Sequence, residues 1–220
     1  RRLRENHQVS SDWYVCQAQR AGQRSIWFKL SQNGTELSAL DRDFARSLID
    51  NGFTVWNSWF DRRTLYLCML QGGGSILTAE EFLSRNPSGM NVAVGSIRSM
   101  LGSGEIPRRT TEILNGLHES EANELIRSRI FINCFLELTG GRPFDIDAVC
   151  RSGDLIFVAE FKRKYPSRSG QFGIDGHLIT LAKMLPPAHP LYHFILRDLR
   201  GHAGKHSDPS EALIDPNDEG

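Results

Sequence analysis

The sequence predicts an α/β protein of the α+β kind, with a small N-terminal α/β domain ahead of a C-terminal domain built on a mixed sheet. Short apolar runs alternate with helical patterns in both halves of the chain. A stretch rich in Gly, Ser and Asn at residues 86–106 lies between the halves. We therefore expect domains at 1–100 and 101–205, and a flexible acidic tail at 206–220.

The N-terminal half contains apolar runs at strand spacing and one clear helical pattern. Strands are predicted at residues 13–18, 25–30, 53–60 and 64–70, and a helix at 41–50 that Asn51-Gly52 ends. The sequence Thr78-Ala79-Glu80-Glu81 resembles a capping box that opens a short helix. We expect this half to serve recognition, dimerisation or contact with a protein partner.

The C-terminal half predicts the order helix, three strands, helix, strand. The expected ranges are 110–127 for the first helix, 130–138, 144–150 and 155–162 for the strands, 171–185 for the second helix and 192–199 for the last strand. Pro186-Pro187 ends the second helix. A turn at residues 151–154 joins two of the strands into an antiparallel hairpin.

Charged residues gather where this hairpin ends. Asp147 lies 13 residues before Glu160, and Lys162 lies two residues after Glu160. Residues i and i+2 of a strand point to one face, so Glu160 and Lys162 project together, and Asp147 on the paired strand reaches the same patch. Two readings stay open: a divalent-metal site, or an ordinary ion pair at the edge of the sheet.

The predicted helix at 110–127 carries two acids on its apolar stripe, Glu121 and Glu124. Acids on an apolar face need an explanation. Glu121 lies four residues from both Leu117 and Leu125, so it is the first choice for a functional acid and Glu124 the second. The alternative is a helix face that ends at solvent.

An aspartate, a hairpin-length gap and then Glu-x-Lys resemble the PD-(D/E)XK nuclease superfamily, with its restriction-endonuclease-like αβββαβ core, over residues 110–200. The literal Pro-Asp pair is missing, because Phe144 follows Pro143. This leaves Asp145 and Asp147 as candidates. We choose Asp147, because its spacing is similar to that of small members with a Glu-Ile-Asp segment.

The resemblance implies a metal-dependent site. Mg²⁺ (or Mn²⁺) would be held by Asp147, Glu160 and the backbone carbonyl of Phe161, with Glu121 binding through water or a second metal. Lys162 would orient the attacking water and offset charge in the transition state. Asp145, Glu124 and Gln171 are further candidates around this site.

The function implied is a metal-dependent nuclease, with DNA favoured over RNA as the partner. Alternatives are a nuclease toxin or defence effector, and a non-catalytic nucleic-acid- or protein-binding module on a nuclease fold. Residues expected to contact phosphates are Arg163, Lys164, Arg168 and His177. A solvated basic loop is the alternative for this cluster. The net charge of zero argues against a general nucleic-acid coat.

The composition is that of a soluble globular protein, with 40% hydrophobic and 24% charged residues. No apolar run approaches the ~20 residues that span a bilayer, so no membrane partner is expected. The four cysteines lack metal-ligand spacing, which favours free thiols in a reducing, cytoplasmic compartment. Export remains open for an effector. The first residues lack a secretory signal, and the absence of an initiator Met suggests a piece of a longer protein.

Overall fold

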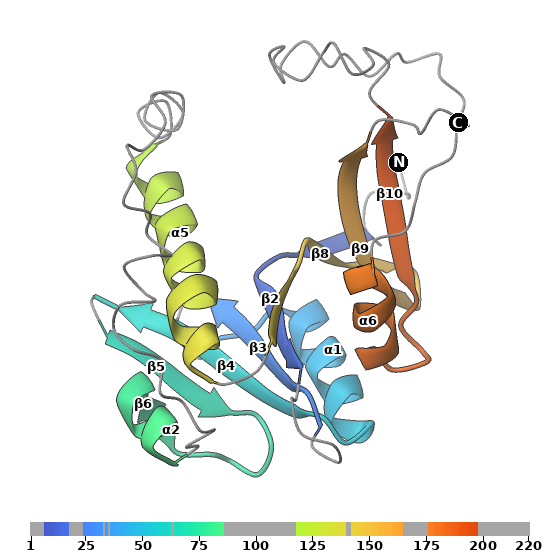
Figure 1. The fold of residues 1–220 in the computed structure, drawn as a ribbon. Helices are drawn as coiled ribbons and strands as arrows, with labels where there is room; N and C mark the ends of the chain where they lie inside the picture. Colours follow the sequence, from blue (N-terminus) through green and yellow to red (C-terminus); the bar gives the residue numbers. More distant parts are fainter. Residues whose placement is uncertain are drawn as a thin grey trace.

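The computed structural model describes residues 7–17, 24–32, 34, 36–62, 64–85, 118–139, 142–164 and 176–197. Within these ranges the chain forms two mixed sheets with helices packed against them, so the α+β class is confirmed (Figure 1). None of the described helices is long and apolar enough to cross a bilayer.

The larger sheet has six strands in the order β6-β5-β4-β3-β2-β7. These strands are β2 (Trp13–Gln17), β3 (Ile26–Ser31), β4 (Thr54–Asp61), β5 (Thr64–Met69), β6 (Ile76–Thr78) and β7 (Arg142–Ile146). All neighbours are antiparallel except β3 and β4, which are parallel and joined through a helix. Parallel strands need such a crossover, whereas antiparallel ones can be joined by a short turn.

The smaller sheet has four strands in the order β1-β8-β9-β10. Its members are β1 (His7–Ser10), β8 (Ala148–Ser152), β9 (Leu155–Lys164) and β10 (Leu191–Arg197). The strand β10 runs parallel to β9, and the other pairs are antiparallel. The long central strand β9 carries Glu160 and Lys162.

The helices are α1 (Ala39–Asp50), α2 (Ala79–Arg85), α5 (Glu119–Ile130) with a π-helical continuation η2 (Phe131–Leu136), and α6 (Gly176–Met184). At α1 the Ser38 hydroxyl accepts a hydrogen bond from the Asp41 N–H, which satisfies one free donor of the first turn. The predicted capping box of α2 is confirmed, because Thr78 and Glu81 exchange side-chain to backbone hydrogen bonds.

Strand alternation divides the apolar residues between two cores. Trp13 and Trp27 of the six-stranded sheet pack with Phe44 of α1 and with apolar residues of the four-stranded sheet and α6. On the other face, Tyr14 and Phe28 pack with residues of α2 and η2. Helices therefore cover both faces of the six-stranded sheet. On one face α1 and α6 form the core that is shared with the smaller sheet, and on the other face α2 and η2 form the second core.

The two sheets are joined by a ribbon of two antiparallel strands that runs through both. Ser10 pairs with Val149 in the smaller sheet, and Trp13 pairs with Ile146 in the larger one. The register is the same in both ladders, so Asp12 lies opposite Asp147 where each strand bends between the sheets. These ladders cross the boundary that we expected near residue 100.

The structure differs from the sequence prediction most clearly at residues 130–138, where a strand was predicted. This prediction was wrong: the segment continues α5 as η2. Phe131, Phe135 and Leu136 are buried against Tyr14 and Phe28, at the spacing of one helical face. The order helix, three strands, helix, strand is nevertheless present as α5, β7, β8, β9, α6 and β10, but β7 lies in the six-stranded sheet and β8, β9 and β10 lie in the four-stranded one. The strands β1 and β6 were not predicted.

The remaining predicted elements correspond to observed ones with shifted ends. The range 144–150 forms parts of β7 and β8, with a break at Asp147, and 155–162 lies within β9. Of the two predicted C-terminal elements, 171–185 corresponds to α6 and 192–199 to β10. The segments 110–117, 171–175 and 198–199 lie outside the described residues, as does the expected tail.

Candidate functional site

The β8–β9 hairpin brings Asp147 beside Glu160. Its two-residue turn contains Gly153 in the left-handed region (φ 61°), which glycine adopts without steric cost. Ala148 pairs with Ala159, so the next position of the same register sets Asp147 opposite Glu160. The backbone N–H of Asp147 donates to Glu160 Oε1 at 3.4 Å. The predicted proximity of these two acids is therefore confirmed.

Lys162 completes the set of charges on β9. Its Nζ lies 3.9 Å from Glu160 Oε2, with both side chains on one face of the strand. Glu160 is 3% exposed, whereas Asp147 is open to solvent. Among the described residues of β8, β9 and the bend before them, the two acids Asp147 and Glu160 lie beside a single ammonium, that of Lys162.

The surroundings of Glu160 change its pKa. Burial and the neighbouring charge of Asp147 raise the pKa of Glu160 to about 7, against the lowering effects of the Asp147 N–H and of Lys162. A carboxyl group with this pKa is half protonated near neutrality. The site therefore favours the arrival of positive charge, either as a proton or as a cation.

Phe161 orients its backbone toward Asp147. Its N–H donates to Asp147 Oδ2 at 2.7 Å. In an antiparallel ladder one residue uses its N–H and its carbonyl on the same neighbouring strand, so the Phe161 carbonyl faces the same side. The Phe161 ring lies on the opposite face of β9, 55% exposed, and stacks on Phe194 of β10.

A small cavity of about 140 Å³ opens beside Asp147 and contains Asp145 from the end of β7. The end of α5 contributes Ser128 and Arg129 to its wall, and Asp12 contributes from the opposite strand. Arg129 is the one cation in this wall, so it is well placed to meet an anion next to Asp147. Burial raises the pKa of Tyr14, and the negative charges of Asp12 and Asp145 raise it further. A hydrogen bond from Ser128 acts in the opposite direction.

Glu124, the second-choice helix acid, does not line that wall. The carboxylate of Glu124 accepts a hydrogen bond from Gln32 Nε2 at 2.5 Å and lines a separate, larger cavity. The Glu121 side chain lies outside the described atoms. Its backbone precedes Ser128 by seven residues, about 10 Å along a helix axis. Ser128 and Arg129 are the described α5 residues that lie next to Asp147, and the role of Glu121 stays a prediction.

Several predicted phosphate contacts lie at or beyond the described residues. Arg163 and Lys164 end β9, and their side chains lie outside the described atoms. Arg168 and Gln171 lie outside the described residues. His177 lies in the first turn of α6 and is half-buried.

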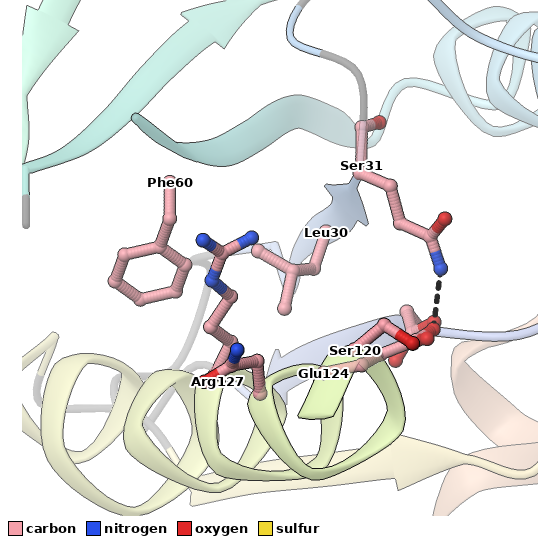
Figure 2. Close-up of a pocket in the computed structure, with 9 residues that line it drawn as sticks. Leu30, Ser31, Phe60, Ser120, Glu124 and Arg127 are labelled. Atoms are coloured by element: carbon pink, nitrogen blue, oxygen red, sulfur yellow. Dashed lines mark hydrogen bonds between the residues drawn. The ribbon is translucent and has the colours of Figure 1, made fainter. Parts of the chain in front are cut away.

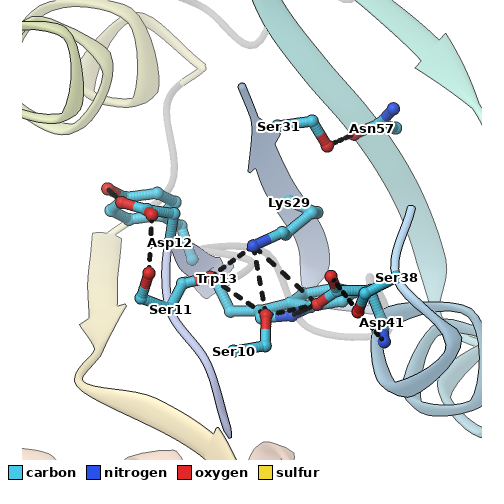
Figure 3. Close-up of polar contacts among 10 residues, drawn as sticks. Ser10, Ser11, Asp12, Trp13, Lys29, Ser31, Ser38, Asp41 and Asn57 are labelled. Atoms are coloured by element: carbon cyan, nitrogen blue, oxygen red, sulfur yellow. Dashed lines mark hydrogen bonds and ion pairs between the residues drawn. The ribbon is translucent and has the colours of Figure 1, made fainter. Parts of the chain in front are cut away.

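A buried polar network lies next to the bend between β1 and β2, at Ser11 and Asp12 (Figure 3). Lys29 Nζ donates to the Ser11 carbonyl at 2.5 Å and to Ser10 Oγ at 3.2 Å, and it lies 3.8 Å from Asp41 Oδ1. Asp41 also accepts from Ser10 Oγ at 2.5 Å and Trp13 Nε1 at 2.8 Å. With its polar groups satisfied, the network fixes the turn that faces the candidate site.

Asp12, Arg129 and the Lys29–Asp41 pair were not predicted from the sequence. Asp12 has a positive φ of 58°, which is uncommon outside glycine and is most frequent in Asn and Asp. The segment Ser10-Ser11-Asp12 before an apolar strand is a turn signal, but its position opposite Asp147 depends on a pairing between distant strands.

The site fits a hard divalent cation with an incomplete protein shell. Within the part of the chain that the structure describes, no three His, Cys, Asp or Glu residues form a metal-binding group. Two carboxylates are nevertheless enough for Mg²⁺, which is often bound by one or two carboxylates, several waters and substrate phosphates. The uncompensated acid charge around Glu160 is consistent with that role.

The chain was also compared with known proteins. No family model matches it, and no curated protein and no solved structure is significantly similar to it.

Proposed function

We propose that this protein is a metal-dependent nuclease that hydrolyses phosphodiester bonds at Asp147, Glu160 and Lys162. The observation that carries the proposal is a buried Glu160 that faces an exposed Asp147 and lies 3.9 Å from the Lys162 ammonium. Burying a carboxylate beside another acid costs stability, and a purely structural ion pair gives no reason for it. A function that requires a bound cation would explain why the two acids lie together.

The ligands for Mg²⁺ or Mn²⁺ would be the carboxylates of Asp147 and Glu160 and the carbonyl of Phe161. A bound divalent metal supplies charge neutralisation at the scissile phosphate and a nucleophilic water at neutral pH. Glu121 is not needed in this arrangement, because substrate and water oxygens complete the shell.

Lys162 is suited to orient the attacking water and to donate to the scissile phosphate. Its side chain is 35% exposed, so the ammonium reaches solvent while it stays close to Glu160. Arg129 lines the cavity beside Asp147 and would hold a flanking phosphate by charge. Arg163, Lys164 and Arg168 follow β9 along the chain and remain candidates for further phosphate contacts. We favour DNA over RNA as the substrate.

The test is incubation with supercoiled plasmid, linear duplex DNA, single-stranded DNA and RNA, each with Mg²⁺, Mn²⁺ or EDTA. We expect cleavage of at least one substrate with either metal and none in EDTA. Asp147→Asn, Glu160→Gln and Lys162→Met should each abolish it while the circular dichroism spectrum is retained. Asp154→Asn, at the exposed turn of the same hairpin, is the matched control and should cleave normally.

A second candidate is a nucleic-acid-binding module without catalysis. The observation in its favour is that the described residues contain no complete group of three metal ligands. Binding without cleavage on all four substrates in every metal would support this second function. Cleavage that persists in excess EDTA would contradict the metal mechanism.

A further inference from the structure

A second, larger cavity lies between α5 and the strands β3 and β4, next to the candidate nuclease site (Figure 2). Its volume is about 320 Å³, within the range of sites for small organic groups. It shares Asp12 with the smaller cavity that contains Asp147. A polymer whose backbone crosses Asp147 would therefore have its neighbouring unit at the opening of the larger cavity.

The walls of this cavity suit a flat ring. Leu30 and Phe60 supply apolar surface, and Arg127 of α5 extends its guanidinium toward them (Figure 2). No hydrogen bond or ion pair links Arg127 to another residue in the described part of the chain. A guanidinium and a phenyl ring are the two side-chain groups on which nucleobases stack most readily.

The polar wall of the cavity includes two carboxylates, which only accept hydrogen bonds. The Glu124 carboxylate lies opposite Gln32, whose amide donates to it, and Asp12 adds a second carboxylate. The Asn123 amide lies on the same face of α5. Two carboxylates repel a phosphate group, so they exclude the sugar–phosphate backbone from this cavity. They are good acceptors for the exocyclic amines of bases.

We propose that the cavity binds one unpaired base of a nucleic-acid substrate and prefers bases with an exocyclic amine over thymine or uracil. The inference rests on the proposed nuclease function, which brings the strand to Asp147. A base must leave its duplex to enter such a pocket. The substrate is therefore single-stranded, or carries an unpaired nucleotide next to the scissile phosphate.

The preference has a simple chemical origin. Adenine, cytosine and guanine each offer an amino group to Glu124 or Asp12. Thymine and uracil offer these carboxylates only the imide N3–H, and the carbonyl oxygens on either side of it would then face the carboxylates, which sets acceptors against each other. Phe60 and Arg127 contact ring faces, so they add affinity for every base alike.

The experiment measures binding of fluorescein-labelled oligo(dA), oligo(dC) and oligo(dT) by anisotropy, to the full chain in EDTA and to the Lys162→Met variant, which should not cleave, in Mg²⁺. We expect oligo(dA) and oligo(dC) to bind several-fold more tightly than oligo(dT). Phe60→Ala should weaken binding to oligo(dA) and oligo(dC) by about tenfold, the loss of one stacked base. Glu124→Gln should remove the discrimination against oligo(dT), because an amide also donates a hydrogen bond.

The matched controls are Tyr192→Ala, an exposed aromatic residue of β10, and Glu80→Gln on α2. Both should bind as the unchanged protein does. Should Phe60→Ala lose its fold by circular dichroism, Arg127→Ala tests the same wall. Equal binding of the three oligonucleotides, no binding to any of them, or a Glu124→Gln variant that still rejects oligo(dT) would overturn the inference.

These results separate the inference from the proposed nuclease function. Base-selective binding by a protein that cleaves nothing in Mg²⁺ or Mn²⁺ would support the pocket and contradict the nuclease. Metal-dependent cleavage without base preference, and unaffected by Phe60→Ala, would support the nuclease and overturn the pocket.

Discussion

At the scale of single residues, Glu160 links the chemistry of the site to the stability of the fold. Its folded-state pKa of about 7 is above the ordinary value of 4.5. The folded protein therefore binds the proton more tightly, and stability is full below about pH 4.5 and is lost as pH rises through 7. At neutral pH the buried carboxylate of Glu160 therefore lowers the unfolding free energy of the metal-free protein.

We predict that Glu160→Gln raises the melting temperature in EDTA above pH 7. The shift of the pKa from 4.5 to about 7 corresponds to at most about 3 kcal/mol of unfolding free energy. At pH 4 the gain should vanish, because the native carboxyl is then protonated in both states. Thermal melts across this pH range test it, with the exposed Glu80→Gln on α2 as control. A variant less stable than the unchanged protein at pH 8 would refute the argument.

The same residue predicts how metal binding depends on pH. A cation must displace the proton of Glu160, so binding releases a proton below about pH 7. We expect the affinity for Mn²⁺, measured by calorimetry, to rise between pH 6 and 8 and to level off above it. In Glu160→Gln the affinity should be much weaker and nearly independent of pH. Tight, pH-independent binding by both proteins would place the metal elsewhere.

At the scale of elements, the Lys29–Asp41 network ties the start of α1 to β3. Burial raises the pKa of Asp41, but the Lys29 charge and hydrogen bonds from Ser10, Ser38 and Trp13 together hold it below its usual range. We predict that Asp41→Asn costs about 3–5 kcal/mol of unfolding free energy, since it leaves the Lys29 ammonium buried without a counter-charge.

Urea unfolding at neutral pH measures this cost. Asp43→Asn, which removes the exposed ion pair with Arg151 on the same helix, is the control and should change stability far less. The double variant Lys29→Met, Asp41→Asn should recover part of the loss, because no buried charge remains. A small effect of Asp41→Asn alone would mean that water reaches Lys29.

The elements also show what local sequence determines. The turn at Gly153 fixes the register of β8 and β9, so the neighbours Asp147 and Glu160 follow from counting residues. The apolar run after α5 was wrongly assigned to a strand because short apolar runs fit either structure. Phe131 and Phe135, four residues apart, are buried on one helical face, and only the sheet they pack against resolves the ambiguity.

At the scale of the whole molecule, the pairing of β1 with β8 and of β2 with β7 joins segments more than 120 residues apart. No turn or repeat links such strands, so their register depends on which apolar faces pack together in the complete fold. For the same reason Asp12 and Arg129 could not be assigned to the site, whereas Asp147, Glu160 and Lys162 could.

This topology predicts that the C-terminal half cannot fold alone. Without residues 1–100, β8 and β7 lose their neighbours β1 and β2, and the shared core loses Trp13, Trp27 and Phe44. A fragment of residues 101–220 should therefore lack dispersed amide signals in NMR and show no cooperative thermal transition. The full chain should unfold in a single calorimetric transition, because both cores depend on one six-stranded sheet. A folded fragment, or two separate transitions, would instead indicate two independent domains.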